Sequence, residues 1–316
     1  MDTLKFHKLQ NYKTDSGAQY EKLSTSYQVF GKELHSAPIV LVHHALTGNS
    51  DVISHEKGWW KEIVGVNKLI DLNKFTVIAF NIPGNGYDGF LIDNYKDFTT
   101  SDIAKIFHKV LIDLDVNNVF AIIGGSLGGG IAWEMACLYP SFSEYIIPIA
   151  SDWKSSDWII AHNAVQESIL LNSKKPLEDA RKMSMLFYRT PQSFTQKFNR
   201  TKTENNLSYN VESWLNHQGD KLKNRFHLKA YLMMNHLLTS INVAPECLIK
   251  IESTIIQIGV NSDLFFIPEE NIKTKKILYE FKIPNQYHEI KSIDGHDAFL
   301  IEHKQIIDFL SPIFTK

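Results

Sequence analysis

The chain has 316 residues, of which 44% are hydrophobic and 12% are aromatic, enough for one large domain or two small ones with a substantial core. Its 33 Lys and Arg residues nearly balance its 35 Asp and Glu residues, giving a formal net charge of −2. This balance excludes a strong field of one sign on the protein, which would attract nucleic acid or an anionic membrane surface. We therefore expect neither as a partner.

The predicted elements begin with two edge strands. Residues 4–32 alternate loosely between apolar and polar and contain the turn sequence "TDSG", as antiparallel strands do. After them the chain contains short, continuously apolar or β-rich runs, which are typical of strands buried on both faces of a parallel sheet. These runs are residues 37–46, 75–84, 119–126, 145–150, 253–263 and 287–294.

Helical patterns fill the intervals between these strands. Apolar residues from Ile103 to Leu114 recur at helical spacing after "TTSD", and another such pattern closes the chain from Ile306 to Ile313. Between residues 151 and 245 the strand signal disappears and charged helical sequence replaces it. We therefore predict an α/β core, residues 1–150 and 246–316, with a mostly parallel sheet flanked by helices and an inserted helical cap, residues 151–245.

A candidate nucleophile lies between the third buried run and the next helix. Residues 124–128, "GGSLG", match G-x-S-x-G, in which a serine sits on a strained strand-to-helix turn and glycines two residues away on each side avoid a steric clash. Ser126 is the predicted nucleophile, and the N–H of Leu127 is a predicted oxyanion donor. The run contains neither G-x-G-x-x-G nor GK[ST], which argues against a dinucleotide or phosphate loop; a tight turn with an incidental serine remains an alternative.

The acid and the base are sought later in the chain, at the ends of later strands. Asp263 ends one apolar run, and His296 follows the last one, so we predict a Ser126–His296–Asp263 triad. A turn carboxylate and a surface histidine are the alternatives for the last two. The second oxyanion donor is expected in "HHALTG", at Leu46 or its neighbour Ala45.

Metal and disulfide sites are not expected. His43 and His44 are adjacent and would point to opposite faces of a strand, and no H-E-x-x-H motif accompanies them. Cys137 and Cys247 stand in apolar surroundings without a CxxC pair, as reduced thiols do. The N-terminal sequence has no apolar signal region and no run is long enough to span a bilayer, so we expect a cytoplasmic protein.

Several blocks of sequence together resemble one family. The segments "HALTGNSDV", "IIGGSLGGGIAWEMACLYP", "HQGDKLKNRF", "NSDLFFIPEE" and "GHDAFLIE" are similar, in order, to those of the homoserine O-acetyltransferase family, which has the α/β-hydrolase fold. The resemblance implies a ping-pong reaction of methionine biosynthesis. Ser126 would take an acyl group from acetyl-CoA, or another acyl-CoA, and pass it to the γ-hydroxyl of L-homoserine.

The same resemblance implies roles for two further residues. Asp297, beside His296, would bind the substrate ammonium, and Arg189 of "FYRT" would bind its carboxylate. A helix cap and a solvated cap-domain residue are their respective alternatives. The resemblance also implies a homodimer formed through the cap, small-molecule substrates and no permanently bound cofactor. Succinyl transfer, another acceptor such as serine, an esterase or deacetylase that uses water, and a non-catalytic binding protein all remain open.

Overall fold

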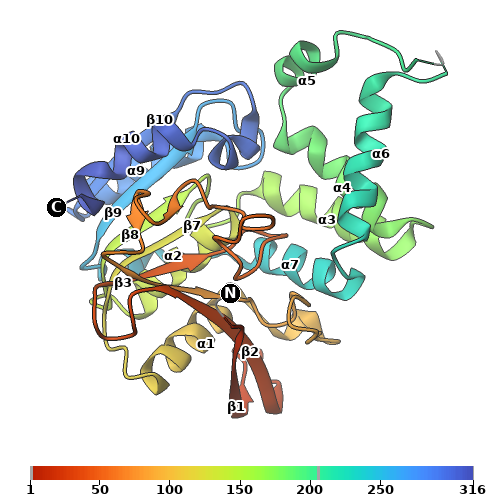
Figure 1. Ribbon diagram of the computed structural model, residues 1–316. Coiled ribbons are helices and arrows are strands. Elements are labelled where there is room, and N and C mark those ends of the chain that lie inside the picture. The colour runs from red at the N-terminus through yellow and green to blue at the C-terminus, as the bar shows by residue number, and fades with distance from the viewer. Residues whose placement is uncertain (1–2, 205–206, 316) are drawn as a thin grey trace.

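The computed structural model describes residues 3–204 and 207–315, and its centre is an eight-stranded sheet (Figure 1). The strand order is β1-β2-β6-β3-β7-β8-β9-β10, with β1 and β2 antiparallel at one edge and the strands from β6 to β10 parallel. This confirms the predicted parallel sheet and its antiparallel lead-in. The strands are β1 (Lys5–Lys13), β2 (Gln19–Gly31), β3 (Ile39–His43), β6 (Thr76–Phe80), β7 (Val119–Gly125), β8 (Ser143–Ile149), β9 (Thr254–Val260) and β10 (Asn285–Ile290). A separate two-stranded sheet, β4 (Val64–Gly65) with β5 (Ile70–Asp71), was not predicted.

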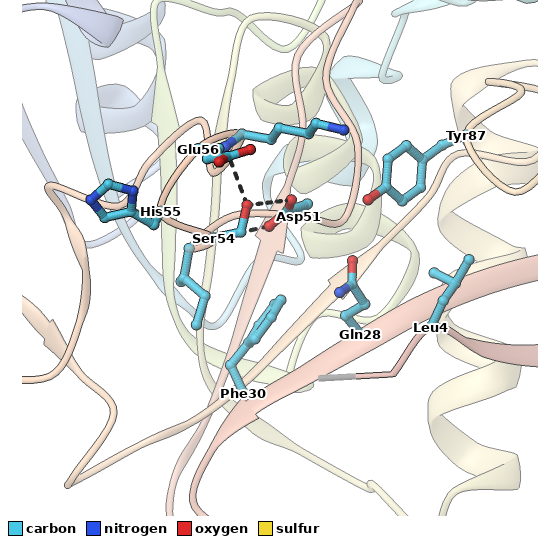
Figure 2. Close-up of a pocket in the computed structure, with 10 residues that line it drawn as sticks. Leu4, Gln28, Phe30, Asp51, Ser54, His55, Glu56 and Tyr87 are labelled. Atoms are coloured by element: carbon cyan, nitrogen blue, oxygen red, sulfur yellow. Dashed lines mark hydrogen bonds between the residues drawn. The ribbon is translucent and has the colours of Figure 1, made fainter. Parts of the chain in front are cut away.

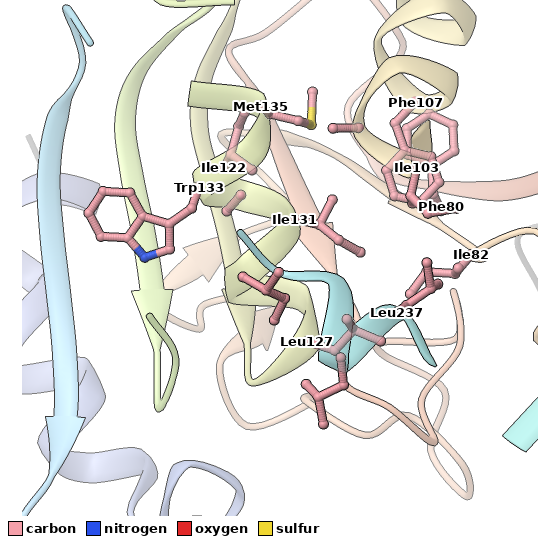
Figure 3. Close-up of a cluster of buried hydrophobic side chains, with 14 of the residues drawn as sticks. Phe80, Ile82, Ile103, Phe107, Ile122, Leu127, Ile131, Trp133, Met135 and Leu237 are labelled. Atoms are coloured by element: carbon pink, nitrogen blue, oxygen red, sulfur yellow. The ribbon is translucent and has the colours of Figure 1, made fainter. Parts of the chain in front are cut away.

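The central strands are buried on both faces, which explains their continuous apolar sequences. Along β3, Leu41 belongs to the core on one face, whereas Val40 and Val42 belong to the core on the other. Helices α1 (Thr100–Asp113) and α2 (Leu127–Leu138) pack on the first face, and α10 (His303–Phe314) packs on the second. Figure 3 shows the first core around α2, which is buried along almost its whole length.

The chain between β8 and β9 is helical, as predicted. Figure 1 shows these helices gathered beyond one side of the sheet, with α5 and α6 projecting farthest from it. Helix α4 packs against α3 and α6, while α7 also contacts α1 and α2. The helices are α3 (Asp157–Asn172), α4 (Pro176–Tyr188), α5 (Pro191–Phe198), α6 (Asn210–Lys223), α7 (Leu228–Ser240) and the short α8 (Pro245–Leu248). The division of the chain at residues 150 and 245 into core and cap stays a prediction.

Two helical features complete the second half of the fold. Helix α9 (Pro268–Glu280) connects β9 to β10, and a 3₁₀ helix, η2 (Gly295–Leu300), lies between β10 and α10. A shorter 3₁₀ helix, η1 (Tyr95–Asp97), precedes α1.

Within residues 3–204 and 207–315, none of the helices combines the length and the apolar character that crossing a bilayer requires.

The turn from β7 into α2 is the tightest junction of the core. Ser126 has φ 55° and ψ −122°, a conformation that is rare for a residue with a side chain. A Cβ on Gly128 would lie 2.3 Å from the carbonyl oxygen of His43, and one on Gly124 would lie 2.5 Å from the backbone of Gly128. Because these neighbours are backbone atoms that cannot move aside, only glycine fits at either position.

We therefore expect Gly128→Ala to lower the free energy of unfolding by about 1–3 kcal/mol, the usual effect of overpacking. It should also slow the labelling of Ser126 by a fluorophosphonate, because α2 must shift away from β3. Gly17→Ala is the matched control, since that glycine has φ +92° and no atom within 4 Å of an added Cβ. The control should lose about 1 kcal/mol through backbone strain alone and label normally. Normal labelling of Gly128→Ala would contradict the steric argument. Urea unfolding and labelling rates provide the measurements.

Candidate active site

The structure brings Ser126, His296 and Asp263 together in one hydrogen-bonded chain. His296 Nε2 lies 2.9 Å from Ser126 Oγ, and His296 Nδ1 lies 2.7 Å from Asp263 Oδ2. The three residues follow β7, β9 and β10, parallel strands whose carboxyl ends share one edge of the sheet. All three are nearly buried, with exposed fractions of 4%, 3% and 2% for the serine, histidine and aspartate. This arrangement can transfer a proton from the serine hydroxyl to the imidazole while the carboxylate stabilises the resulting cation.

The carboxylate of Asp263 is held in place by backbone donors. Its Oδ1 atom accepts hydrogen bonds from the N–H groups of Phe265, at 2.7 Å, and Phe266, at 3.0 Å. Its Oδ2 atom is left for His296. Since one oxygen is fixed by two donors, the other is oriented toward the imidazole, and that orientation places the imidazole proton on Nδ1. Nε2 is then free to accept the proton of Ser126.

Aromatic rings surround His296. Four ring centroids lie within 5.2 to 5.8 Å of the imidazole centroid, and they come from α4, the β9–α9 loop and η2. They exclude water from the base and thereby strengthen its electrostatic interactions with the serine and the aspartate. No sequence pattern predicted this set of rings, although Tyr188 stands in the motif "FYRT" and two phenylalanines stand in "NSDLFFIPEE". The rings belong to Tyr188, Phe265, Phe266 and Phe299.

The two predicted oxyanion donors lie on segments that meet at the elbow. Leu127 is the first residue of α2, where the backbone N–H groups have no partner within the helix and the helix dipole favours negative charge. Leu46 lies in the loop that follows β3 and has an exposed fraction of 6%. The end of β3 touches the first turn of α2 through the close approach of His43 and Gly128. Both candidate donors are therefore attached to the same rigid junction.

Arg189 and Asp297 lie in contact, which the sequence did not predict. Arg189 Nε donates to Asp297 Oδ2 at 2.9 Å, and its Nη1 donates to Asp294 Oδ1 at 2.6 Å. Arg189 follows α4 and Asp297 follows His296 directly, so this ion pair joins a helix of the predicted cap to the loop of the base. Their exposed side-chain fractions of 22% and 17% leave both groups accessible to a small ligand. A guanidinium beside a carboxylate is suited to the two opposite charges of an amino acid.

Asp152 is a second buried carboxylate at this side of the sheet, but it does not belong to the hydrogen-bonded series of Ser126, His296 and Asp263. It follows β8 and accepts hydrogen bonds from Thr274 Oγ1 at 2.7 Å and Asn271 Nδ2 at 3.0 Å, both on α9. Burial raises its pKa to about 6. Asp152 therefore ties the end of β8 to α9, whereas Asp263 faces the histidine.

A cavity of about 990 Å³ lies apart from Ser126, His296 and Asp263. Figure 2 shows its lining, in which Gln28 of β2 and Tyr87 face the segment from Asp51 to Lys57. Ser54 donates a hydrogen bond to Asp51 there and thereby fixes the turn. No member of the triad lines it. Among residues 3–204 and 207–315, no group of three or more His, Cys, Asp and Glu side chains is placed to bind a metal ion.

Comparison with known proteins first defines the class. The family model for the alpha/beta hydrolase fold matches residues 38–302, so the chain belongs to the α/β hydrolases. The crystal structure of esterase E22 superposes on this chain with a TM-score of 0.88 and 16% sequence identity. The match covers 99% of this chain and 100% of the esterase chain, and at this identity it shows a similarity of fold alone.

More similar proteins define the family. The homoserine O-acetyltransferase of Cyclobacterium marinum is 32% identical over 333 residues, which cover 96% of this chain and 92% of that protein. The crystal structure of homoserine O-acetyltransferase from Staphylococcus aureus has a TM-score of 0.83 at 25% identity, covering 98% of this chain and 94% of its own. The chain belongs to the homoserine O-acetyltransferase family, and the resemblance predicted from its motifs is confirmed.

We expect Asp263→Asn to slow the labelling of Ser126 by a fluorophosphonate about 10⁴-fold, the size of effect seen when a triad acid becomes an amide. The amide cannot accept from both the backbone N–H groups and the imidazole, so the histidine would adopt the wrong tautomer. Asp152→Asn is the matched control: it changes an equally buried carboxylate and should label within a few-fold of the native rate. Equal losses in the two variants would show that burial of a carboxylate, and not its contact with His296, is what matters.

Proposed function

We propose that this protein is an acyl-CoA:L-homoserine O-acyltransferase, with acetyl-CoA as the donor, acting in methionine biosynthesis. The observation that carries the proposal is the placement of the Arg189–Asp297 pair directly beside the triad histidine, since Asp297 follows His296 in η2. A Ser-His-Asp chain alone fits any acyl transfer. An adjacent pair of opposite charges favours an amino acid as the second substrate. Relatives named homoserine O-acetyltransferase support the same conclusion.

In the first half-reaction the acyl group moves from sulfur to oxygen. Ser126 Oγ attacks the thioester carbon as His296 Nε2 takes its proton, and the C=O electrons move to the oxygen, which the N–H groups of Leu127 and Leu46 stabilise. The tetrahedral intermediate collapses, the C–S bond breaks, and CoA leaves as a thiol with the proton from the imidazolium. An acyl ester of Ser126 remains.

In the second half-reaction the acyl group moves to homoserine. His296 takes the proton of the γ-hydroxyl as that oxygen attacks the acyl-serine carbon, and the same two N–H groups stabilise the second oxyanion. The bond to Ser126 Oγ breaks, and His296 returns the proton to the serine. Asp263 stabilises the imidazolium in both halves. A positioned alcohol competes with water through its high effective concentration.

The amino-acid substrate is proposed to bind at the pair beside the base. Its ammonium would contact Asp297, and its carboxylate would contact Arg189. Arg189 already donates to two carboxylates, on Asp294 and Asp297, so the three side chains together carry one excess negative charge. A bound ammonium compensates this excess, which a neutral alcohol cannot do.

A hydrolase is the second candidate. The triad geometry would serve it equally, because water can take the place of the homoserine hydroxyl at His296. The ion pair beside the base favours transfer over hydrolysis, since a hydrolase that uses water has no need to bind a second charged substrate.

We also infer the wider setting of the enzyme. Acyl-CoA and homoserine are its small-molecule partners, and no cofactor is permanently bound. A homodimer formed through the cap would cover apolar side chains that are exposed on α3 and α4, among them Leu171 and Leu186, with exposed fractions of 60% and 51%. The cysteines, Cys137 and Cys247, are both free thiols, in keeping with a cytoplasmic location.

The proposed reaction predicts that release of CoA thiol from acetyl-CoA depends on homoserine. We expect homoserine to accelerate steady-state release at least 10-fold over buffer alone, with serine and succinyl-CoA giving slower rates, and Ser126→Ala to abolish release. A thiol-reactive dye measures each combination of donor and acceptor. Release at the same rate with and without an amino acid would exclude the transferase and leave the hydrolase.

The proposed substrate contact predicts a selective effect of Asp297→Asn. Loss of the carboxylate should raise the KM for homoserine about 10-fold or more, because a charge-assisted hydrogen bond contributes roughly 1.5–3 kcal/mol. The KM for acetyl-CoA should stay within two-fold. Asp308→Asn, on the exposed side of α10, is the control and should change neither constant. An equal rise in both constants would show that Asp297 supports the site as a whole and does not bind the amino acid.

A further inference from the structure

His44 is a buried histidine for which the proposed mechanism has no role. It directly follows β3, its exposed fraction is 1%, and it is one residue before the peptide unit that joins Ala45 to Leu46. His44 Nδ1 lies 2.8 Å from the carbonyl oxygen of Ala45. Its other nitrogen, Nε2, lies 3.1 Å from the backbone nitrogen of Ile82 and 3.3 Å from Asn85 Nδ2.

These contacts fix the protonation of the ring. The backbone N–H of Ile82 can only donate, so Nε2 of His44 must be the acceptor and carries no proton. The single proton of the neutral ring therefore lies on Nδ1 and is donated to the carbonyl of Ala45. Burial favours the same form, since it lowers the pKa of His44 to about 4.

The bond to Ala45 determines where the N–H of Leu46 points. A trans peptide is planar, and its C=O and N–H groups point in opposite directions. The Ala45 carbonyl accepts a second hydrogen bond from the N–H of Gly48 at 2.9 Å. Since two donors hold the oxygen on one side, the N–H of the same peptide, on Leu46, is held on the other.

We propose that His44 is a positioning residue that sets the second oxyanion donor by clamping the peptide between Ala45 and Leu46. The proposal rests on the proposed role of Leu46 in acyl transfer. A second set of hydrogen bonds holds the same loop farther along. The side chain of Asn85, which contacts His44, also donates to Asn81 Oδ1. The same Asn81 oxygen accepts a hydrogen bond from the N–H of Ser50. The loop is thus held at two points against the chain that follows β6.

A second anchor reaches the same loop from the helical segment between β8 and β9. Arg225, in the turn between α6 and α7, donates from Nη1 to the carbonyl oxygen of Thr47 at 2.7 Å and from Nη2 to Thr47 Oγ1 at 3.2 Å. This contact holds the peptide between Thr47 and Gly48, whereas His44 holds the peptide between Ala45 and Leu46. His44 is the side chain that contacts the peptide carrying the proposed donor.

The test measures acylation of Ser126 by p-nitrophenyl acetate, which requires neither CoA nor homoserine. We expect His44→Ala to lower the burst rate about 10²- to 10³-fold, the effect of losing one oxyanion donor, with the KM for the ester within three-fold. His108→Ala is the control, because His108 is a partly buried histidine of α1 whose ring packs against Tyr139 and Phe142, beyond the C-terminal end of α2 and away from Ser126. It should lose thermal stability to a similar extent while its burst rate stays within a few-fold.

A second pair of variants keeps the proposal testable if the alanine variant does not fold. His44→Asn places an amide N–H near the position of Nδ1 and can still donate to Ala45, whereas His44→Gln places its amide near Nε2 and cannot. We expect the asparagine variant to acylate at least 10-fold faster than the glutamine variant. Equal rates in this pair, or a His44→Ala variant that acylates as fast as the native protein, would overturn the proposal. Because acylation is followed without homoserine, a failure of the acceptor assignment would appear only in the thiol-release assay.

Discussion

The close approach of two backbone segments, the end of β3 and the first turn of α2, is the constraint on which the site depends. Gly128 lies against the carbonyl of His43, and the N–H of Ser126 donates to Ile149 of β8 at 2.9 Å, so the strained serine is held from two neighbouring strands. Strain at such a turn costs about 1–3 kcal/mol and persists only where the surroundings fix it. The same contact attaches the loop of Leu46 to the helix of Leu127.

The orientation of His296, the proposed base, is likewise fixed by its neighbours. Backbone N–H groups at the end of β9 fix the aspartate, the aspartate fixes the tautomer of His296, and aromatic rings from three segments exclude water around it. His44 shows the same principle in the loop of Leu46, the proposed second oxyanion donor. There the N–H of Ile82 fixes the tautomer of His44, and the imidazole in turn fixes the carbonyl of Ala45. In both cases a backbone donor decides the chemistry of a buried ring.

The sequence was sufficient for the sheet and for the elements that carry the triad, because strand burial and the G-x-S-x-G turn are local patterns. It overextended strands such as 37–46 and 75–84, which end at His43 and Phe80, because Leu46 and Ile82 stay in the core after the ladder of hydrogen bonds has ended. It could not find the contact between Arg189 and Asp297, or the clamp at Ala45. These join residues that are distant in the chain, or depend on the direction of one peptide plane, and neither leaves a periodic signal.

The helices between β8 and β9 contact each part of the proposed site, which bears on the choice between transfer and hydrolysis. Helix α4 supplies Tyr188 against the base and ends at Arg189, while the turn after α6 supplies Arg225 to the oxyanion loop. A displacement of these helices would therefore disturb His296, the proposed amino-acid site and the proposed oxyanion donor Leu46 together. In the proposed mechanism, an acyl-serine formed under such a cover would meet water rarely and a bound alcohol at high effective concentration. In that mechanism the covering helices would favour the alcohol kinetically, even though the triad itself does not distinguish it from water.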